Sequence, residues 1–253
     1  MSYLNDIQIN FDIRYDIMLG NILVGDDLMK ETIYTIPINE AFALDVECPF
    51  CYIEDNLEKK YLSAALGAAL MEPDTRVDMN SRGFCRHHYE SMFNSKENIL
   101  GLSLVMETFY KSQIGILEKW GKNSPKAMKD VLNDCHICND MNFTMERYID
   151  NCIFMWKDES DFRNLFESKK GFCIKHFLHL VERADKKLGK KDKGVFVDIL
   201  VKMQLENMKR IDEELLWFSK KYDYRFDKEP WGNSKDSPER SIKKAIGNAD
   251  LEV

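Results

Sequence analysis

Six cysteines and two histidines stand in four short clusters with the spacing of metal ligands. Two clusters are Cys-x-x-Cys and two are Cys-x-x-His, in the order Cys48 with Cys51, Cys85 with His88, Cys135 with Cys138, and Cys173 with His176. Thiolate sulfur and imidazole nitrogen are the ligands of structural zinc, which takes four of them in a tetrahedron. A Cys-x-x-Cys joined to a Cys-x-x-His therefore predicts a three-Cys, one-His site, and the chain has ligands for two zinc ions.

Other uses of these thiols remain open. Iron or an iron-sulfur cluster also takes cysteine ligands, and a Cys-x-x-Cys pair alone is typical of dithiol redox proteins. A redox dithiol needs no second Cys-x-x-His partner, whereas both halves of this chain have one. Zinc is therefore the favoured occupant, with iron or iron-sulfur as the alternative.

The spacing shows an internal duplication. The Cys-x-x-Cys pairs are offset by 87 positions (Cys48 to Cys135) and the Cys-x-x-His pairs by 88 (Cys85 to Cys173). The offset of 87 also relates Tyr61 to Tyr148. Two copies of one module explain these matches, and the simplest pairing gives each module its own site. A duplicated protein can instead join the first Cys-x-x-Cys to the second Cys-x-x-His, and spacing does not exclude this.

The remaining cysteine and histidines fit other roles. Cys152 lies on a stripe with Met145, Tyr148 and Met155 at steps of three and four, so it is expected to be a small core residue. The other histidines, which adjoin the clusters, are expected to be surface groups or to support the ligands: His87, His136 and His179.

Periodicity predicts a mainly α-helical protein. A helix is expected from about residue 54 to the break at Glu72-Pro73, and a long amphipathic helix over residues 99–120. Its counterpart in the second half runs over residues 201–222, and the lysine-rich segment 186–194 before it is expected to be a solvated loop.

The two ends of the chain differ from the modules. Residues 7–17 alternate apolar and polar side chains, which predicts a strand that docks on the body or pairs with another subunit in an oligomer. Near the other end, a short helix capped by Ser237 and stopped by Gly247 is expected, with Trp231 anchoring the tail. The predicted organisation is an N-terminal extension (1–33), a first module (34–125), a second module (126–222) and a C-terminal strap (223–253).

A polar cavity between the modules is a further hypothesis. Two acidic turns at the repeat offset each hold two carboxylates and a guanidinium, and the six residues are Glu72, Asp74, Arg76, Glu159, Asp161 and Arg163. If the copies face each other, these groups converge on a site for a second metal or a cationic ligand. The competing interpretation, which their position at helix starts favours, is capping and surface ion pairing.

Composition narrows the function classes. The 253 residues include 36 Lys or Arg and 43 Asp or Glu, and a net charge of -7 argues against binding nucleic acid. No apolar run is long enough to span a membrane, and the first residues do not resemble a signal peptide, so a cytoplasmic location is expected. The chain has no nucleophile elbow, phosphate loop or His-Glu-x-x-His motif, so hydrolase and nucleotide-dependent enzymes have no support.

The motifs CPFC, GFCRHHYESMF, CHIC, GFCIKHFLHL and EPWGNSKD resemble a family of uncharacterised proteins, classed as a domain of unknown function, from anaerobic Gram-positive bacteria. The resemblance runs from about Tyr34 to near Gly247 and leaves residues 1–28 outside. It implies no activity.

These observations favour a non-enzymatic binding or adaptor protein with two structural zinc ions, which recognises a protein or small ligand in the groove between its modules. Two alternatives remain. A redox protein would use the Cys-x-x-Cys pairs or an iron centre, and a zinc-handling protein would exchange its metal. Thiol accessibility separates the binding protein from the redox protein, because closed zinc sites resist alkylation whereas catalytic thiols react at once.

Overall fold

The computed structural model describes residues 35–247, and within this range the fold is entirely helical. Eleven α-helices and three short 3-10 turns are present there, with no strand. The predicted strand over residues 7–17 lies outside the described residues. The helices are α2 (Ile36–Ala43), α3 (Pro49–Ala65), α4 (Pro73–Arg82), α5 (Arg86–Ser95), α6 (Ile99–Glu118), α7 (Ser124–Leu132), α8 (His136–Asp158), α9 (Ser160–Glu167), α10 (Ile174–Lys187), α11 (Lys190–Lys220) and α12 (Ser237–Ile246).

The helix boundaries repeat with the offset found in the ligands. Helix α3 begins at Pro49 and α8 at His136, and α4 begins at Pro73 and α9 at Ser160, both 87 positions apart. Helices α2 and α7 begin 88 positions apart, as do α5 and α10. The first copy is therefore α2 to α6 and the second is α7 to α11, with α12 outside the repeat.

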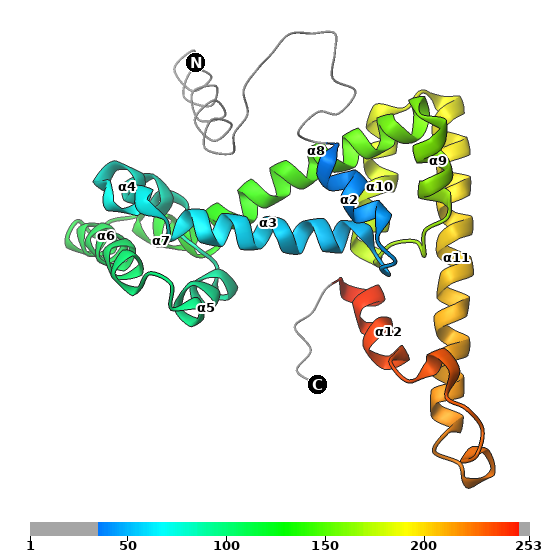
Figure 1. Cartoon of the computed structure of the whole chain (residues 1–253). Helices are drawn as coiled ribbons and strands as arrows, with labels where there is room; N and C mark the ends of the chain where they lie inside the picture. Colours follow the sequence, from blue (N-terminus) through cyan, green and yellow to red (C-terminus); the bar gives the residue numbers. More distant parts are fainter. Residues whose placement is uncertain (1–34, 248–253) are drawn as a thin grey trace.

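The two copies exchange their first helices. Helix α2 packs on α9 of the second copy, and α7 packs on α4 of the first. Helices α3 and α8 pack against each other and connect the two ends of the molecule. Figure 1 shows α4 to α7 gathered at one end, and α2 with α9, α10 and α11 at the other. Each end is therefore built from both copies.

Aromatic side chains from both copies fill the core at the α9 end. Phe42 of α2 stacks on Phe166 of α9 with ring centroids 5.7 Å apart, and Phe50 of α3 lies 5.7 Å from Phe172. All four rings are fully buried. Burying rings of this size is a dominant stabilising contribution, so this cluster holds the exchanged helix in place.

The long helices follow the predicted pattern with one correction. Helix α6 confirms the prediction over residues 99–120. The lysine-rich segment predicted as a loop is instead almost all helical, because α10 continues to Lys187 and α11 starts at Lys190. The charge pattern suits α10, whose last turn holds Lys186 and Lys187, but not α11, whose first turn holds three lysines beside Asp192. A lysine-rich composition therefore did not by itself indicate a loop.

The C-terminal helix lies across α10 and α11. Helix α12 begins at Ser237 with Asp236 as its N-cap, one residue before the predicted cap, and ends at Gly247 as predicted. Trp231 is 37% exposed and contacts Phe218, whereas Lys244 is 4% exposed. Lys244 is therefore the more deeply buried contact of this segment, and Trp231 packs on Phe218 of α11. Within residues 35–247, no helix is long and apolar enough to cross a membrane.

Candidate metal centres

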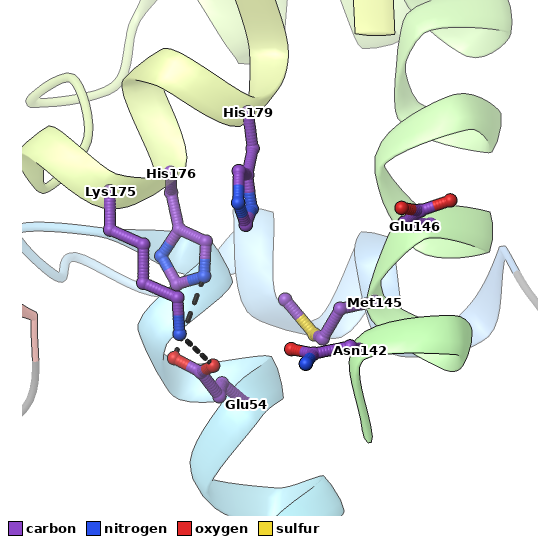
Figure 2. Close-up of a pocket in the computed structure, with 7 residues that line it drawn as sticks. All are labelled: Glu54, Asn142, Met145, Glu146, Lys175, His176 and His179. Carbon is purple, nitrogen blue, oxygen red and sulfur yellow. Dashed lines mark hydrogen bonds and ion pairs between the residues drawn. The ribbon is translucent and has the colours of Figure 1, made fainter. Parts of the chain in front are cut away.

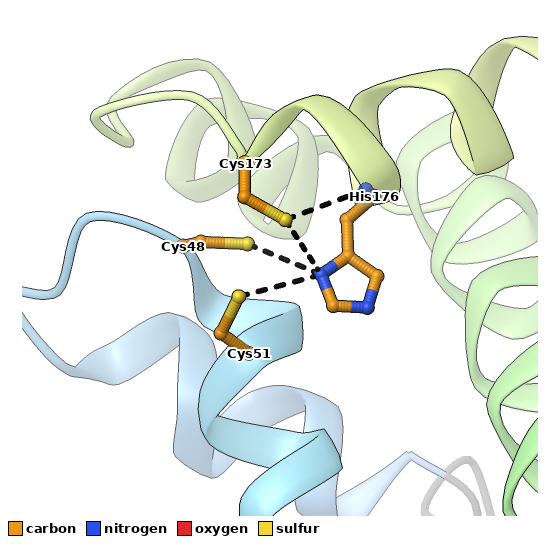
Figure 3. Close-up of side chains that lie close together, drawn as sticks. All are labelled: Cys48, Cys51, Cys173 and His176. Carbon is orange, nitrogen blue, oxygen red and sulfur yellow. Dashed lines mark hydrogen bonds between the residues drawn. The ribbon is translucent and has the colours of Figure 1, made fainter. Parts of the chain in front are cut away.

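Four side chains from both copies converge at the α10 end of the molecule, and we name this group site 1: Cys48, Cys51, Cys173 and His176. His176 Nδ1 lies 3.2 Å from the Sγ of Cys173 and 3.5 Å from those of Cys48 and Cys51 (Figure 3). All four residues are buried.

The other four predicted ligands form site 2 at the opposite end: Cys85, His88, Cys135 and Cys138. His88 Nδ1 lies 3.2 Å from Cys85 Sγ, 3.2 Å from Cys135 Sγ and 3.4 Å from Cys138 Sγ. The Sγ atoms of Cys85 and Cys138 are 3.9 Å apart. Sites 1 and 2 thus have the same composition and the same orientation of the imidazole.

These distances fit a single tetrahedral ion. Zinc bonds of about 2.3 Å to sulfur and 2.0 Å to nitrogen give a tetrahedron with edges of about 3.8 Å between sulfurs and 3.5 Å between sulfur and nitrogen. In each group all the ligand atoms lie within 4.8 Å of one another. The separation of 3.9 Å between Cys85 and Cys138 far exceeds the roughly 2.05 Å of a disulfide bond.

The ligands join the copies in the crossed arrangement. Site 1 takes its Cys-x-x-Cys from the first copy and its Cys-x-x-His from the second, and site 2 does the reverse. The simplest expectation, a complete site within each module, is not what the structure shows. The exchange of α2 and α7 explains the crossing, because the start of α3 lies with α10 and the start of α8 lies with α5.

Each site lies where two helices begin. Cys48 and Cys173 are the N-caps of α3 and α10, and Cys85 and Cys135 are the N-caps of α5 and α8. The unpaired N–H groups and partial positive charge of a helix N-terminus stabilise thiolates. At site 1, for example, the His176 backbone N–H donates a hydrogen bond to Cys173 Sγ over 3.5 Å.

The Gly-Phe that precedes each Cys-x-x-His has a structural role. Gly83 and Gly171 have φ of +68° and +75°, in the left-handed region that favours glycine. A Cβ on Gly171 would lie 2.8 Å from Gln204 Oε1, which accepts the backbone N–H of Phe172. Phe84 and Phe172 are buried. The motif thus turns the chain and anchors it just before the ligands.

Two carboxylates on α3 lie behind the metal-facing histidines. His176 Nε2 is 3.6 Å from Glu54 Oε2, and His88 Nε2 is 3.3 Å from Glu58 Oε1. A carboxylate on the far nitrogen fixes the ring orientation and directs Nδ1 at the ion. Hydrogen bonding from His88 is the main reason that the pKa of Glu58 falls to about 2, and this outweighs its partial burial.

The ligands of site 2 also shift one another's pKa values. Burial alone would lower the pKa of His88, but its hydrogen bonds with Cys135 and Glu58 outweigh burial and raise that pKa to about 10. The hydrogen bond with Cys138 is the largest of the effects that lower the pKa of Cys135 to about 3. The same contact raises the pKa of Cys138 well above its ordinary value, so Cys135 is the member of this pair that carries the thiolate charge.

The two sites differ in their cover. In site 1, Gly247 at the end of α12 lies so close that a Cβ there would be 3.8 Å from the Sγ atoms of both Cys51 and Cys173. Site 2 lies at the end of the molecule away from α12, and Cys85 and Cys138 are only half-buried. Within residues 35–247, no helix plays the part of α12 at site 2. Site 1 is sealed and site 2 is partly open to solvent.

The six residues of the hypothesised inter-module cavity do not converge. Figure 1 places α4 and α9 at opposite ends, and all four carboxylates are exposed. The arginines serve their own copies: Arg76 donates to the Leu70 carbonyl, and Arg163 donates to those of Trp156 and Lys157. Because the copies exchange their first helices, the acidic turns at Glu72 and Glu159 lie at opposite ends of the molecule. Their shared repeat offset therefore did not mean that they lie close together. The six residues that were expected to share a cavity, and do not, are Glu72, Asp74, Arg76, Glu159, Asp161 and Arg163.

A cavity of about 250 Å³ is present elsewhere, beside site 1. Figure 2 shows its lining residues, in which Lys175 reaches across to pair with Glu54 next to His176. They come from α3, α8 and α10: Glu54, Asn142, Met145, Glu146, Lys175, His176 and His179. Sequence reasoning did not find Glu54, although it lies one turn after Cys51 on the same helix.

The remaining candidates have the expected places. Cys152 is fully buried, and burial raises the pKa of its thiol, as expected for a core residue. His87 is exposed and its Nε2 lies 2.6 Å from Glu58 Oε1. His136 is buried beside Asp140, and His179 is half-buried with its ring 6.2 Å from that of His176. None of these four residues belongs to site 1 or site 2.

Fold and site together define an all-helical protein, over residues 35–247, with two Cys3His groups that could hold metal ions. The chain belongs to DUF6062, a family of unknown function, whose profile matches residues 29–252. This confirms the resemblance drawn from the motifs. Searches of curated proteins and of solved structures found no match.

Proposed function

We propose that sites 1 and 2 each bind one structural zinc ion, and that the protein is a zinc-stabilised binding protein rather than an enzyme. The observation that carries the proposal is the crossed pairing, in which each group takes two ligands from each copy. An ion in each group would therefore join the two copies, one ion at each end of the molecule. Structural zinc contributes directly to folding free energy, which suits a role as a staple.

The geometry favours a single bound ion over an iron-sulfur cluster or a redox dithiol. Four ligand atoms within 4.8 Å of one another enclose room for a single ion, whereas an iron-sulfur cluster needs room for several atoms. A dithiol redox pair needs an accessible thiolate, and site 1 has none because all four of its residues are buried. At site 2, where Cys85 and Cys138 are half-buried, the close approach of all four ligand atoms supports a bound ion instead. Four protein ligands also leave no open position for a substrate.

A role in binding another protein is supported by the surface of α6. Tyr110, Ile114 and Leu117 lie on one helical stripe and are each more than half exposed, and Trp120 follows just beyond the helix with 59% exposure. An apolar stripe of this kind is typical of helix-mediated protein contact. Replacing Ile114 and Leu117 by serine should remove partner binding or self-association while the metal content stays unchanged.

Metal analysis tests the zinc proposal. Protein purified without added metal should contain two zinc ions per chain and no acid-labile sulfide, and a chelator should lower the melting temperature strongly. The cysteines should resist alkylation until chelator is added. Iron with sulfide, or freely reactive thiols in the folded protein, would overturn the proposal in favour of a redox protein. Transfer of both ions to a chelator without unfolding would instead indicate zinc handling.

A further inference from the structure

A second group of ligand atoms lies on the solvent side of site 2. Glu58, His87 and His88 offer three ligand atoms within 4.8 Å of one another, and we name these residues the outer group. Glu58 Oε1 is 2.6 Å from His87 Nε2 and 3.3 Å from His88 Nε2. The His87 side chain is 59% exposed and that of Glu58 is 26% exposed, so an ion from solvent can reach both.

We propose that the outer group is an exchangeable zinc position through which the ion enters and leaves site 2. This rests on the proposed function, because it requires that site 2 bind zinc. Two imidazoles and one carboxylate are a common ligand set for zinc, and the fourth position would hold water. His87 and Glu58 face solvent while His88 Nε2 is buried, so the set joins the surface to the buried side of site 2, as expected of a transfer position.

His88 connects the outer group to site 2. Its Nδ1 faces the three thiols of site 2 and its Nε2 faces Glu58 and the outer group. A neutral imidazole has one nitrogen free for a metal, so the two positions are filled alternately rather than together. The outer group is then used when site 2 is empty, which is when an entry position is needed.

The transfer is a ligand exchange without oxidation or reduction. The arriving hydrated ion loses water as it bonds to Glu58 and to the Nε2 atoms of His87 and His88, and any proton that these nitrogens donate to Glu58 passes to water. These bonds then break as bonds form to the three Sγ atoms and to His88 Nδ1, and any thiol still protonated releases its proton to water. The His88 proton moves through solvent from Nδ1 to Nε2, where it is donated to Glu58.

Site 1 provides an internal comparison. Lys175 stands at the position of His87, 88 residues later, and pairs with Glu54 as His87 pairs with Glu58. A protonated lysine cannot ligate zinc, and its positive charge repels an approaching cation. Site 1 is also covered by Gly247, whereas Cys85 and Cys138 of site 2 are half-buried. Sites 1 and 2 therefore have the same ligand set, but only site 2 has an entry position beside it.

Time-resolved loading tests the proposal. Apo protein is mixed with zinc, aliquots are quenched with an alkylating reagent, and peptide mass spectrometry reports which cysteines have become protected. In the wild type, Cys85, Cys135 and Cys138 should be protected before Cys48, Cys51 and Cys173. The variant His87→Lys, which copies the arrangement at site 1, should load site 2 about tenfold more slowly, the lower end of the range for losing a favourable local field.

Two further variants make the result specific. His179→Ala removes a histidine beside site 1 that belongs to neither site nor to the outer group, and it should load site 2 at the wild-type rate. Lys175→His, which copies the outer group at site 1, should load site 1 faster. His87→Lys should still reach two zinc ions per chain at equilibrium, because His87 is not a ligand of site 2.

The outcomes separate the two proposals. Wild-type loading of site 2 in His87→Lys, together with two zinc ions at equilibrium, would overturn the entry position and leave the structural sites intact. Failure of the wild type itself to protect its cysteines with zinc would overturn the proposed function. Equal slowing of both sites by His87→Lys would also refute the entry position, because it would show a general loss of folding competence.

Discussion

Replacing Lys244 should loosen site 1 alone, because this side chain fastens α12 beside that site. The side chain is 4% exposed, and its Nζ donates to the backbone carbonyls of Glu47 and Lys170. Glu47 immediately precedes the first ligand, Cys48, and Lys170 lies three residues before Cys173. Lys244 therefore fastens α12 to both chain segments that enter site 1, and places Gly247 over the sulfurs.

The magnitude follows from these contacts. A hydrogen bond from a charged group contributes about 1.5–3 kcal/mol, and Lys244→Met removes two of them. Burial lowers the pKa of Lys244 despite the nearby Glu47 carboxylate, so relief of its desolvation offsets part of the loss. A net loss of about 2 kcal/mol would raise the population in which α12 is detached by about 30-fold.

Chelator competition measures the effect. Zinc release from the wild type should be biphasic, with a fast phase from site 2 and a slow phase from site 1. Lys244→Met should accelerate the slow phase by up to about 30-fold and leave the fast phase unchanged. Lys243→Met is the matched control, because Lys243 lies on the same helix but pairs only with Glu239 at the surface. The reasoning is refuted if the slow phase does not change or if both phases accelerate alike.

Three other predictions concern single residues. Gly247 has φ of +90°, so Gly247→Ala should cost about 1–3 kcal/mol and speed release from site 1, as seen in chelator competition. Cys152→Ala should lower stability by about 1 kcal/mol in denaturant titration yet keep two zinc ions, and a loss of one ion would contradict its core role. Burial alone would raise the pKa of Asp150, but hydrogen bonds and charge interactions with Arg183 and Lys187 together outweigh burial and lower this pKa in the folded protein below its ordinary 3.8. This ion pair therefore stabilises the fold above pH 3.8 and is lost as the pH falls through the lower folded value. Asp150→Asn should cost about 2 kcal/mol at pH 7 and little at pH 2, and equal losses at both pH values would refute this account.

The sequence predicted the ligand types but not their partners. Cys48, Cys51, Cys85 and His88 stand at a spacing that fits a local site as well as a crossed one. The choice depends on where α2 packs, and that is decided by Phe42 meeting Phe166 across 124 residues of chain. No pattern within one module carries this information, because tertiary packing sets it.

Local patterns predicted helices better than contacts between them. The helical stripe through Cys152 and the end of α12 at Gly247 were predicted correctly, since both depend on neighbours within a turn or two. The expectation that the acidic turns at Glu72 and Glu159 face each other rested on the repeat alone. The exchanged helices place these turns at opposite ends of the molecule. The supporting carboxylates Glu54 and Glu58 were missed, although both lie on α3, the helix that Cys48 caps.

The most direct test of the crossed sites is a map of cysteine protection in Cys51→Ser. The zinc-loaded variant is treated with an alkylating reagent, and each cysteine is scored by peptide mass spectrometry. The crossed pairing predicts that Cys48 and Cys173 become reactive while Cys85 stays protected, because Cys51 shares its site with Cys173. Reaction of Cys48 and Cys85 with Cys173 still protected would show that each copy closes its own site, and would contradict the structure proposed for this protein.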